Sequence, residues 1–120
     1  MGAEIVIKEL NDLNLESILY PNGFVGFKYT IPLGRFRNQQ IEIALEVSNF
    51  PDIPPSGPYI KPFLLPINAV QGDHPFCGIH IRNQPTTEFQ YWSRPVEGWD
   101  QTNKSMTVYL AFLRTLFDFE

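Results

Sequence analysis

The chain has 120 residues, a formal net charge of −4, 43% hydrophobic residues and a single cysteine. This length and apolar content suit one folded domain, residues 1–120, and the acidic balance argues against a nucleic-acid-binding protein, which normally has a basic face. No apolar run approaches the roughly 18 residues of a membrane span. One thiol cannot form an internal disulfide and no signal peptide is visible, so the sequence predicts a cytoplasmic protein that does not enter a membrane.

The first half of the chain predicts a short N-terminal element followed by strands. Residues 5–19 carry apolar side chains at mixed spacing, which indicates a short helix or a loop, and the Pro-Asn-Gly sequence at 21–23 marks a turn. Residues 24–33 are rich in aromatic and β-branched side chains and predict a strand. Residues 41–48 alternate apolar and polar side chains and predict a half-buried antiparallel strand. Its apolar side chains are Ile41, Ile43, Leu45 and Val47.

The second half predicts a proline-rich corner, a third strand, an irregular segment and a helix. Residues 50–58 contain four prolines, which end any ladder. Residues 59–67 predict a strand that its prolines place at a sheet edge or at a strand end. Residues 68–95 hold both histidines and the cysteine and lack periodicity, and an irregular segment of this length is often functional.

The clearest helical pattern lies in the last fifteen or so residues. Apolar side chains recur there at i, i+3, i+4 and i+7, and Thr102 or Asp100 is expected to cap the helix start. The apolar positions are Met106, Tyr109, Leu110, Leu113, Leu116 and Phe117. The order of elements predicts an α+β fold with an antiparallel meander sheet and a C-terminal helix packed on one of its faces.

Several stretches resemble the ubiquitin-conjugating enzymes. ALEVSNFPDIPPSGPYI at 44–60 looks like the strand, proline-rich turn and strand of that family, and HPF at 74–76 resembles its His-Pro-Asn motif. GWDQTNKSMTVYLAFLRTLF at 98–117 resembles the tryptophan-led helix after the active site, and YWSRP at 91–95 looks closest to a bacterial branch of the superfamily. The resemblance covers residues 29–117.

This resemblance implies a UBC-like fold, with an antiparallel meander sheet, a C-terminal helix on one face and a short N-terminal element. It implies a protein that accepts a ubiquitin-like modifier from an activating enzyme as an oxyester or thioester and transfers it to a target. A deconjugating peptidase is the further partner expected in such a pathway, and no cofactor is expected. The alternative is a catalytically inactive UBC-fold module that binds a ubiquitin-like protein.

The sequence departs from the family pattern at two points. Phe76 stands where the family has the asparagine thought to aid the oxyanion. Cys77 lies only three residues after His74, whereas the family's catalytic cysteine lies further on, shortly before the tryptophan. Counting back from Trp99 to that place leads to Ser93, the only nucleophile there.

We therefore expect Ser93 to be the leading candidate nucleophile and Cys77 the alternative. Serine is a weak nucleophile and needs a base, whereas a cysteine thiolate is far more available at neutral pH. The candidate bases, among which spacing does not choose, are His74, His80 and Asp100. Arg94 is expected to hold an anionic partner or the developing oxyanion.

The same residues have structural interpretations. A serine in an Arg-Pro turn usually bonds the backbone, and a cysteine such as Cys77 is most often a small buried hydrophobe. Trp92 and Trp99 are more often core or interface residues than chemical groups. Two histidines fall short of the three or four protein ligands that zinc requires, so no metal site is predicted.

Overall fold

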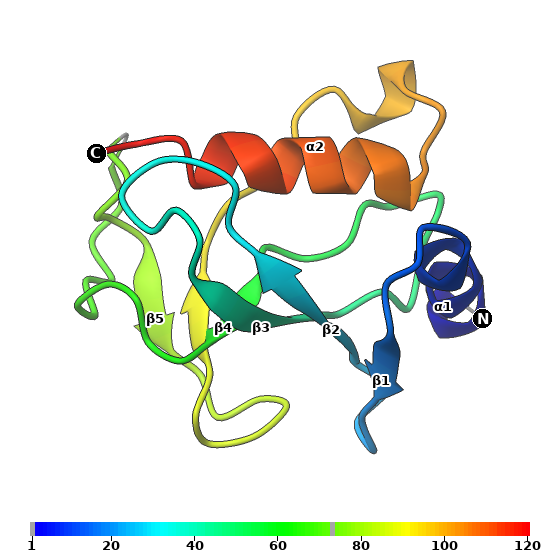
Figure 1. The fold of residues 1–120 in the computed structure, drawn as a ribbon, viewed down its shortest axis with the longest axis horizontal. Coiled ribbons are helices and arrows are strands. Elements are labelled where there is room, and N and C mark those ends of the chain that lie inside the picture. Colours follow the sequence, from blue (N-terminus) through cyan, green and yellow to red (C-terminus); the bar gives the residue numbers. More distant parts are fainter. Residues whose placement is uncertain (1, 73) are drawn as a thin grey trace.

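The computed structural model describes residues 2–72 and 74–120, and in this part of the chain a six-stranded antiparallel sheet and two α-helices form an α+β fold (Figure 1). The helices are α1 (Gly2–Asp12) and α2 (Met106–Leu116), and the 3-10 helix η1 (Trp99–Gln101) precedes α2. The strands are β1 (Ser17–Leu19), β2 (Val25–Thr30), β3 (Gln40–Leu45), β4 (Tyr59–Lys61), β5 (Ile79–Ile81) and β6 (Gln90–Trp92). No helix of the described residues has the length and apolarity to cross a membrane.

The strand order is β1-β2-β3-β4-β6-β5. β1 to β4 lie side by side in sequence order, but β6 pairs with β4 and leaves β5 at the sheet edge. β4 is therefore an internal strand, and the prediction of an edge strand is wrong. The alternative, a strand end, is confirmed, because β4 stops at Lys61 and the next residue, Pro62, has no N–H to donate.

The main core lies between the sheet and α2, which crosses one face of the sheet (Figure 1). The predicted alternation of residues 41–47 is confirmed, since Ile41, Ile43, Leu45 and Val47 are all buried in this core. From the helix side, Leu113 and Phe117 are buried in the same cluster. The fully buried Trp92 of β6 lies with its ring centroid 5.3 Å from that of Phe117.

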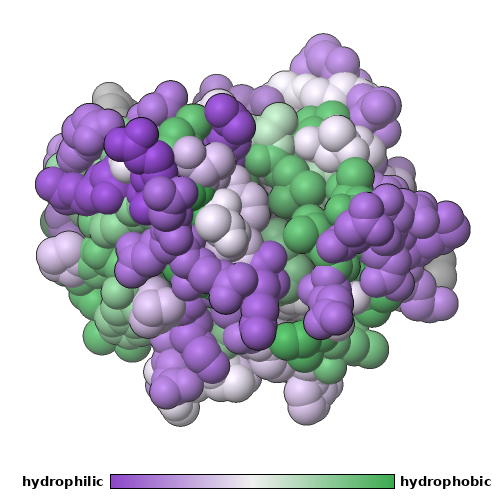
Figure 2. Space-filling model, in the orientation of Figure 1, coloured by the Kyte–Doolittle hydropathy of each residue, from purple (hydrophilic) through white to green (hydrophobic). Residues whose placement is uncertain are grey.

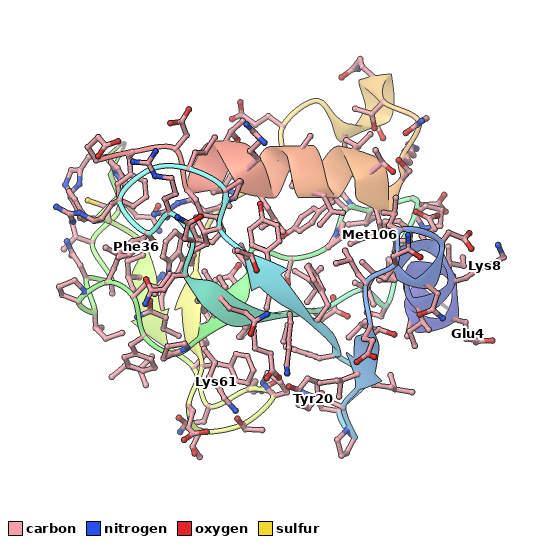
Figure 3. The ribbon with its side chains drawn as sticks, in the orientation of Figure 1. Glu4, Lys8, Tyr20, Phe36, Lys61 and Met106 are labelled. Atoms are coloured by element: carbon pink, nitrogen blue, oxygen red, sulfur yellow. The ribbon has the colours of Figure 1, made fainter. Side chains whose placement is uncertain are left out.

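A second apolar cluster covers part of the opposite face. Its buried members are Phe24, Ala44, Tyr59 and Phe89, flanked by the partly buried Tyr20 and Tyr91. The rings meet edge-on or tilted, with centroid distances of 5.0 Å for Phe24–Tyr59 and 4.7 Å for Tyr59–Tyr91. The Tyr20 hydroxyl donates to the Glu42 carboxylate, and Figure 3 places Tyr20 and Lys61 on the side of the sheet away from α2.

The N-terminal element is a complete helix, and the strand β1 that follows it was not expected. Val6 and Leu10, one helical turn apart, reach the main core, whereas Ile5 and Leu13 stay exposed. The exposed apolar residues explain why the sequence spacing looked mixed. Glu9 accepts a hydrogen bond from the Met106 N–H at 2.7 Å, so α1 contacts the start of α2, and Figure 3 shows Met106 beside α1.

The cap of α2 differs from the prediction. Ser105, in an extended conformation, is the N-cap, and its side chain accepts a hydrogen bond from the Val108 N–H. The Thr102 hydroxyl instead donates to the Trp99 carbonyl, and Asp100 forms an ion pair with Lys104. The predicted caps, Thr102 and Asp100, both belong to the turn of η1 rather than to the start of α2.

The segment 68–95, which showed no periodicity, contains two short strands. β5 and β6 have three residues each, too few for an alternation to be seen in the sequence. The fully buried Gln90 of β6 holds the segment after β4. Its Oε1 accepts from the Leu64 N–H and from Trp92 Nε1, and its Nε2 donates to the Leu65 carbonyl. A buried amide needs such partners to offset its desolvation.

The surface carries apolar side chains near this segment. Figure 2 shows a mixed face with a hydrophobic area at the lower left, over the region of β5 and the segment after β4. The exposed large apolar side chains in these parts of the chain are Phe63, Ile67, Val70 and Ile81.

Candidate functional site

A cleft of about 880 Å3 lies near the start of β4, the end of β6 and the C-terminal end of α2. Four segments that are distant in sequence line it: the corner at 53–57, the segment at 71–75 with position 73 outside the described residues, the turn at 93–96, and residues 115–119 in part. Of the residues selected from the sequence, His74, Ser93 and Arg94 line this cleft. A volume in this range is typical of ligand sites in proteins.

The proline corner is held firmly against the sheet. The Trp99 indole N–H donates to the Pro51 carbonyl at 2.7 Å, and the Tyr109 hydroxyl donates to the Ser56 carbonyl at 2.6 Å. Gly57 packs directly on the end of β6, where a Cβ atom would lie 2.3 Å from the Trp92 carbonyl oxygen. Trp92 and Trp99 are 0% and 4% exposed, and neither lines the cleft.

His74 and Cys77 form a side-chain pair beside the cleft. His74 Nε2 lies 2.9 Å from the Cys77 sulfur, and the Cys77 N–H bonds the His74 carbonyl across the turn. The Phe76 N–H donates to His74 Nδ1, so a neutral ring carries its proton on Nε2 and directs it at the sulfur. A thiolate accepts such a bond more strongly than a thiol does.

Access to the sulfur is narrow. Cys77 is only 5% exposed, and a Cβ atom on Gly72 would lie 2.7 Å from the sulfur. Gly72 itself lines the cleft, so a residue without a side chain separates the sulfur from the cleft. A side chain at position 72 would therefore clash with the sulfur.

Ser93 lines the cleft without a partner for its hydroxyl. Its N–H donates to the Gly78 carbonyl at 2.9 Å, which fixes the backbone, but within residues 2–72 and 74–120 its hydroxyl makes no hydrogen bond. The structure therefore brings a histidine to Cys77 and not to Ser93, although the sequence favoured Ser93 as the nucleophile.

Arg94 bonds the backbone of the same turn. Its Nη1 donates to the carbonyls of Cys77 and Ser93 at 2.9 and 3.0 Å, and its Nη2 donates to the Pro75 carbonyl at 2.7 Å. Burial lowers the pKa of the guanidinium, an effect that the nearby Cys77 opposes. Two of these three bonds hold residues 75–77 and the third holds the Ser93 carbonyl, which differs from the expected role of binding an anion.

His80 and Asp100 are not brought to the cleft. His80 lies on β5 with its ring centroid 5.9 Å from that of Tyr91. Asp100 lies in η1, where its carboxylate is 3.3 Å from Lys104 Nζ and its side chain is 78% exposed. Neither residue is a lining residue of the cleft that holds Ser93.

Sequence reasoning missed two contributors. The pairing of His74 with Cys77 had a signal, since a three-residue spacing across a proline turn brings both side chains to one side. Phe119 had none. Its ring contacts Phe76 and Phe36 at centroid distances of 5.7 and 6.0 Å, and it closes the cleft beside the end of α2.

No family model matches the chain, and no curated protein or solved structure is significantly similar to it. The resemblance to ubiquitin-conjugating enzymes thus rests on the residues of the chain themselves.

Proposed function

We propose that the chain is a ubiquitin-conjugating-enzyme-like protein with a UBC-like meander sheet, which takes the acyl group of a ubiquitin-like protein onto a nucleophile in or beside the cleft. One observation carries the proposal. The proline corner at 53–57, the pair His74-Pro75 and the Ser-Arg-Pro turn at 93–95 come together around a single cleft. These segments lie far apart in the sequence, and they are among those that resemble the family.

The geometry favours Cys77 as the nucleophile because His74 lies beside it. In the first step the sulfur adds to the activated C-terminal carbonyl carbon of the modifier. A C–S bond forms, the bond from that carbon to the leaving group of the activating enzyme breaks, and the leaving group takes up the thiol proton. In the second step a target amine attacks the thioester, an amide forms, and the amine proton restores the Cys77 thiol.

Ser93 is the alternative nucleophile and would form an oxyester by the same exchange. It lines the cleft, which Cys77 does not, but none of the described residues bonds its hydroxyl and could take its proton. Serine requires such a base at neutral pH, so this alternative is the weaker of the two.

The test is intact mass spectrometry after incubation with an activating enzyme, a ubiquitin-like modifier and ATP. We expect an adduct equal to the modifier less one water, lost in Cys77→Ala, kept in Ser93→Ala and cleaved by a thiol reductant. Ser48→Ala, an exposed serine outside the cleft, is the control. An adduct that resists thiol, yields to hydroxide and disappears in Ser93→Ala assigns the oxyester instead.

A second function, an inactive UBC-fold module that binds a ubiquitin-like protein, is favoured by the 5% exposure of Cys77 and by the occupied guanidinium of Arg94. Phe76, in place of the family's asparagine, packs on Phe119 and Arg35 and has no amide to offer an oxyanion. This function predicts no adduct in any variant while the modifier still binds, as measured by NMR titration. Absence of both adduct and binding excludes both functions.

A further inference from the structure

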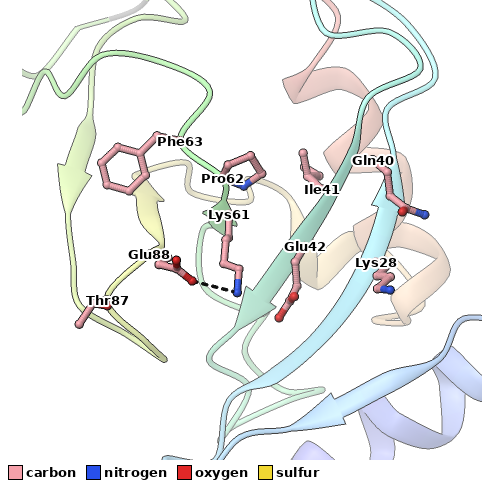
Figure 4. Close-up of a pocket in the computed structure, with 9 residues that line it drawn as sticks. All are labelled: Lys28, Gln40, Ile41, Glu42, Lys61, Pro62, Phe63, Thr87 and Glu88. Carbon is pink, nitrogen blue, oxygen red and sulfur yellow. Dashed lines mark ion pairs between the residues drawn. The ribbon is translucent and has the colours of Figure 1, made fainter.

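Two hollows of the molecule differ in how their charged side chains are paired. The pocket of about 540 Å3 near the end of β4 and the start of β6 holds charges that pair with one another (Figure 4). Lys61 lies 3.3 Å from Glu88, and Lys28 stands opposite Glu42 in the β2–β3 ladder. In the cleft, by contrast, the half-buried Arg94 bonds three backbone carbonyls. Its guanidinium is therefore committed to the backbone around the cleft.

One of these carbonyls belongs to a peptide group that also contacts His74. Arg94 Nη2 donates to the Pro75 carbonyl at 2.7 Å, and the N–H of the same peptide group, that of Phe76, donates to His74 Nδ1 at 3.2 Å. The C=O and N–H of a trans peptide point in opposite directions, so one planar group joins the guanidinium to the imidazole. Because successive hydrogen bonds polarise one another, a cation at the carbonyl makes the N–H a stronger donor.

The bond from Phe76 decides which nitrogen of His74 carries the proton. A backbone N–H can only donate, so Nδ1 accepts, and a neutral imidazole then carries its hydrogen on Nε2. Nε2 lies 2.9 Å from the Cys77 sulfur, so this hydrogen points at the sulfur. The other tautomer would set two N–H groups against each other at Nδ1 and turn a lone pair toward the sulfur. The tautomer therefore determines whether His74 donates to a Cys77 thiolate.

Arg94 also fixes the backbone on both sides of that peptide group. Its Nη1 donates to the carbonyls of Cys77 and Ser93 at 2.9 and 3.0 Å. A guanidinium presents its N–H groups in a rigid planar fork, so three bonds to carbonyls hold residues 75–77 in one place relative to Ser93. The guanidinium carbon lies 5.5 Å from the ring centroid of the fully buried Trp92, which gives the fork a fixed base.

We propose that Arg94 is a positioning residue, which holds His74 in the tautomer that donates to the Cys77 sulfur. It acts through the peptide group between Pro75 and Phe76. His74 then stabilises the thiolate as a hydrogen-bond donor and does not remove the thiol proton. The importance of this arrangement for acyl transfer rests on the function proposed for Cys77, but the series of hydrogen bonds is tested without a modifier.

The first test determines the tautomer by NMR of the full chain with 15N-labelled histidine at pH 8, where an ordinary imidazole is neutral. Protonated and unprotonated ring nitrogens resonate far apart, and His80, the second of the two histidines, is an internal control. In the unchanged chain we expect a protonated Nε2 and an unprotonated Nδ1 in His74. In Arg94→Met, which keeps the length of the side chain without its donors, both signals should move toward each other because the tautomers mix.

Arg82→Ala is the matched control for this spectrum. Its guanidinium carbon also lies over an aromatic ring of β6, 4.7 Å from the ring centroid of Tyr91. Arg82 bonds the Tyr59 side chain, however, rather than the turn at 74–77. We therefore expect Arg82→Ala to leave the His74 signals unchanged.

The second test measures the reactivity of the thiol. The rate at which iodoacetamide alkylates Cys77 at pH 7 is divided by the rate at pH 9.5, where an ordinary thiol is mostly ionised, so that differences in access cancel. Among the described residues, the titratable side chains that face Cys77 are His74 and Arg94. We expect this ratio to fall about fivefold in Arg94→Met, because a hydrogen bond to the thiolate is lost.

Three further variants separate the position of the donor from charge and from base catalysis. Arg94→Lys should lower the ratio by a similar factor, because an ammonium keeps the charge but has no planar fork. His74→Gln should keep most of the ratio, because its amide Nε2 still donates, whereas His74→Leu should lose it. Variants are compared only where circular dichroism shows unchanged folding, and if Arg94→Met fails this condition, Arg94→Lys takes its place in the spectra.

Unchanged His74 signals in the Arg94 variant overturn the proposal. So does a ratio that Arg94→Lys retains, because the charge alone would then act. An equal fall in His74→Gln and His74→Leu also contradicts it, because His74 would then serve as a base. With activating enzyme, modifier and ATP, the lack of an adduct on the unchanged chain contradicts the function proposed for Cys77 and leaves the result for the tautomer as it stands.

Discussion

The two faces of the sheet use similar side chains but are closed in different ways. On the face under α2, side chains from sheet and helix interlock, and the sheet residues Phe27, Ile43, Ile60 and Trp92 are fully buried. On the other face none of the described helices covers the cluster, and Phe24, Tyr59 and Phe89 are buried by one another and by the partly buried Tyr20 and Tyr91. The helix α2 buries one face of the sheet, whereas aromatic side chains bury one another on the other face.

This difference separates the residues that stabilise the fold most from those that remain accessible to solvent. The covered face holds most of the buried apolar area and should dominate the free energy of unfolding. The open face keeps charged side chains in contact with water, such as those of Lys61 and Glu88. The candidate cleft, by contrast, adjoins the covered face, because the end of α2 and the turn after Trp92 line it.

The largest expected effect comes from two phenylalanines three residues apart on opposite faces. Phe27→Ala should lower the free energy of unfolding by about 3–5 kcal/mol, because it leaves a cavity under α2. Phe24→Ala should cost about 2 kcal/mol, because Phe24 is 7% exposed and water can enter the space. Urea unfolding measures both. Equal costs would contradict the contrast between the faces.

Two tyrosine hydroxyls give the next comparison. Tyr109→Phe should cost about 1–2 kcal/mol, because the buried hydroxyl donates to the Ser56 carbonyl, which would lose its partner. Tyr20→Phe should cost about 0.5–1 kcal/mol, because water can replace the hydroxyl at the Glu42 carboxylate. Thermal and urea unfolding of both variants test this order. A larger loss in Tyr20→Phe would place the more important hydroxyl on the open face.

Alkaline pH should destabilise the covered face through Tyr109. Burial raises the pKa of Tyr109 well above its ordinary value of 10.0, and the neighbouring Tyr91 adds to the effect. The folded state therefore favours the neutral phenol, so this contribution is complete below pH 10.0 and is lost as the pH rises above it. Urea midpoints measured across this range should fall less steeply in Tyr109→Phe. An unchanged slope would rule out Tyr109 as the cause.

The smallest effect is expected at the exposed ion pair of the open face. Lys61 and Glu88 are 3.3 Å apart with side chains 36% and 70% exposed. Glu88→Gln should change the free energy of unfolding by less than about 0.5 kcal/mol, because water and salt screen such pairs. The comparison is made by urea unfolding at low and high salt. A change as large as that of Tyr109→Phe would show that the open face is held by charge.

The regular elements could be predicted because the spacing of apolar side chains stays constant along each of them. The alternation of Ile41, Ile43 and Leu45 runs through a strand with one buried face, and the 3.6-residue period of α2 runs through three turns. β5 and β6 are too short to show a period, and β1 was obscured by its exposed Ile18 and Leu19. The cap of α2 was misplaced because all six residues before the helix, 100–105, are polar, and only the backbone conformation of Ser105 selects among them.

The candidate site was only partly readable from the sequence. The sequence supplied His74, Cys77, Ser93 and Arg94, and all four lie at or beside one cleft. The sequence did not predict which way the side chains point. Arg94 directs its N–H groups toward backbone carbonyls, and His74 Nε2 lies against the Cys77 sulfur. Directions of this kind depend on contacts between segments, which spacing along one chain does not determine.

The bond from the Met106 N–H to Glu9 has a consequence for the time course of folding. It joins residues 97 positions apart, so it forms only after nearly the whole chain has been drawn together. Closing so long a loop is entropically costly until other contacts shorten the effective distance. The β2–β3 hairpin, by contrast, needs only a short connection between its strands. We therefore expect the β2–β3 hairpin to form early and the first turn of α2 to gain its carboxylate partner late in folding.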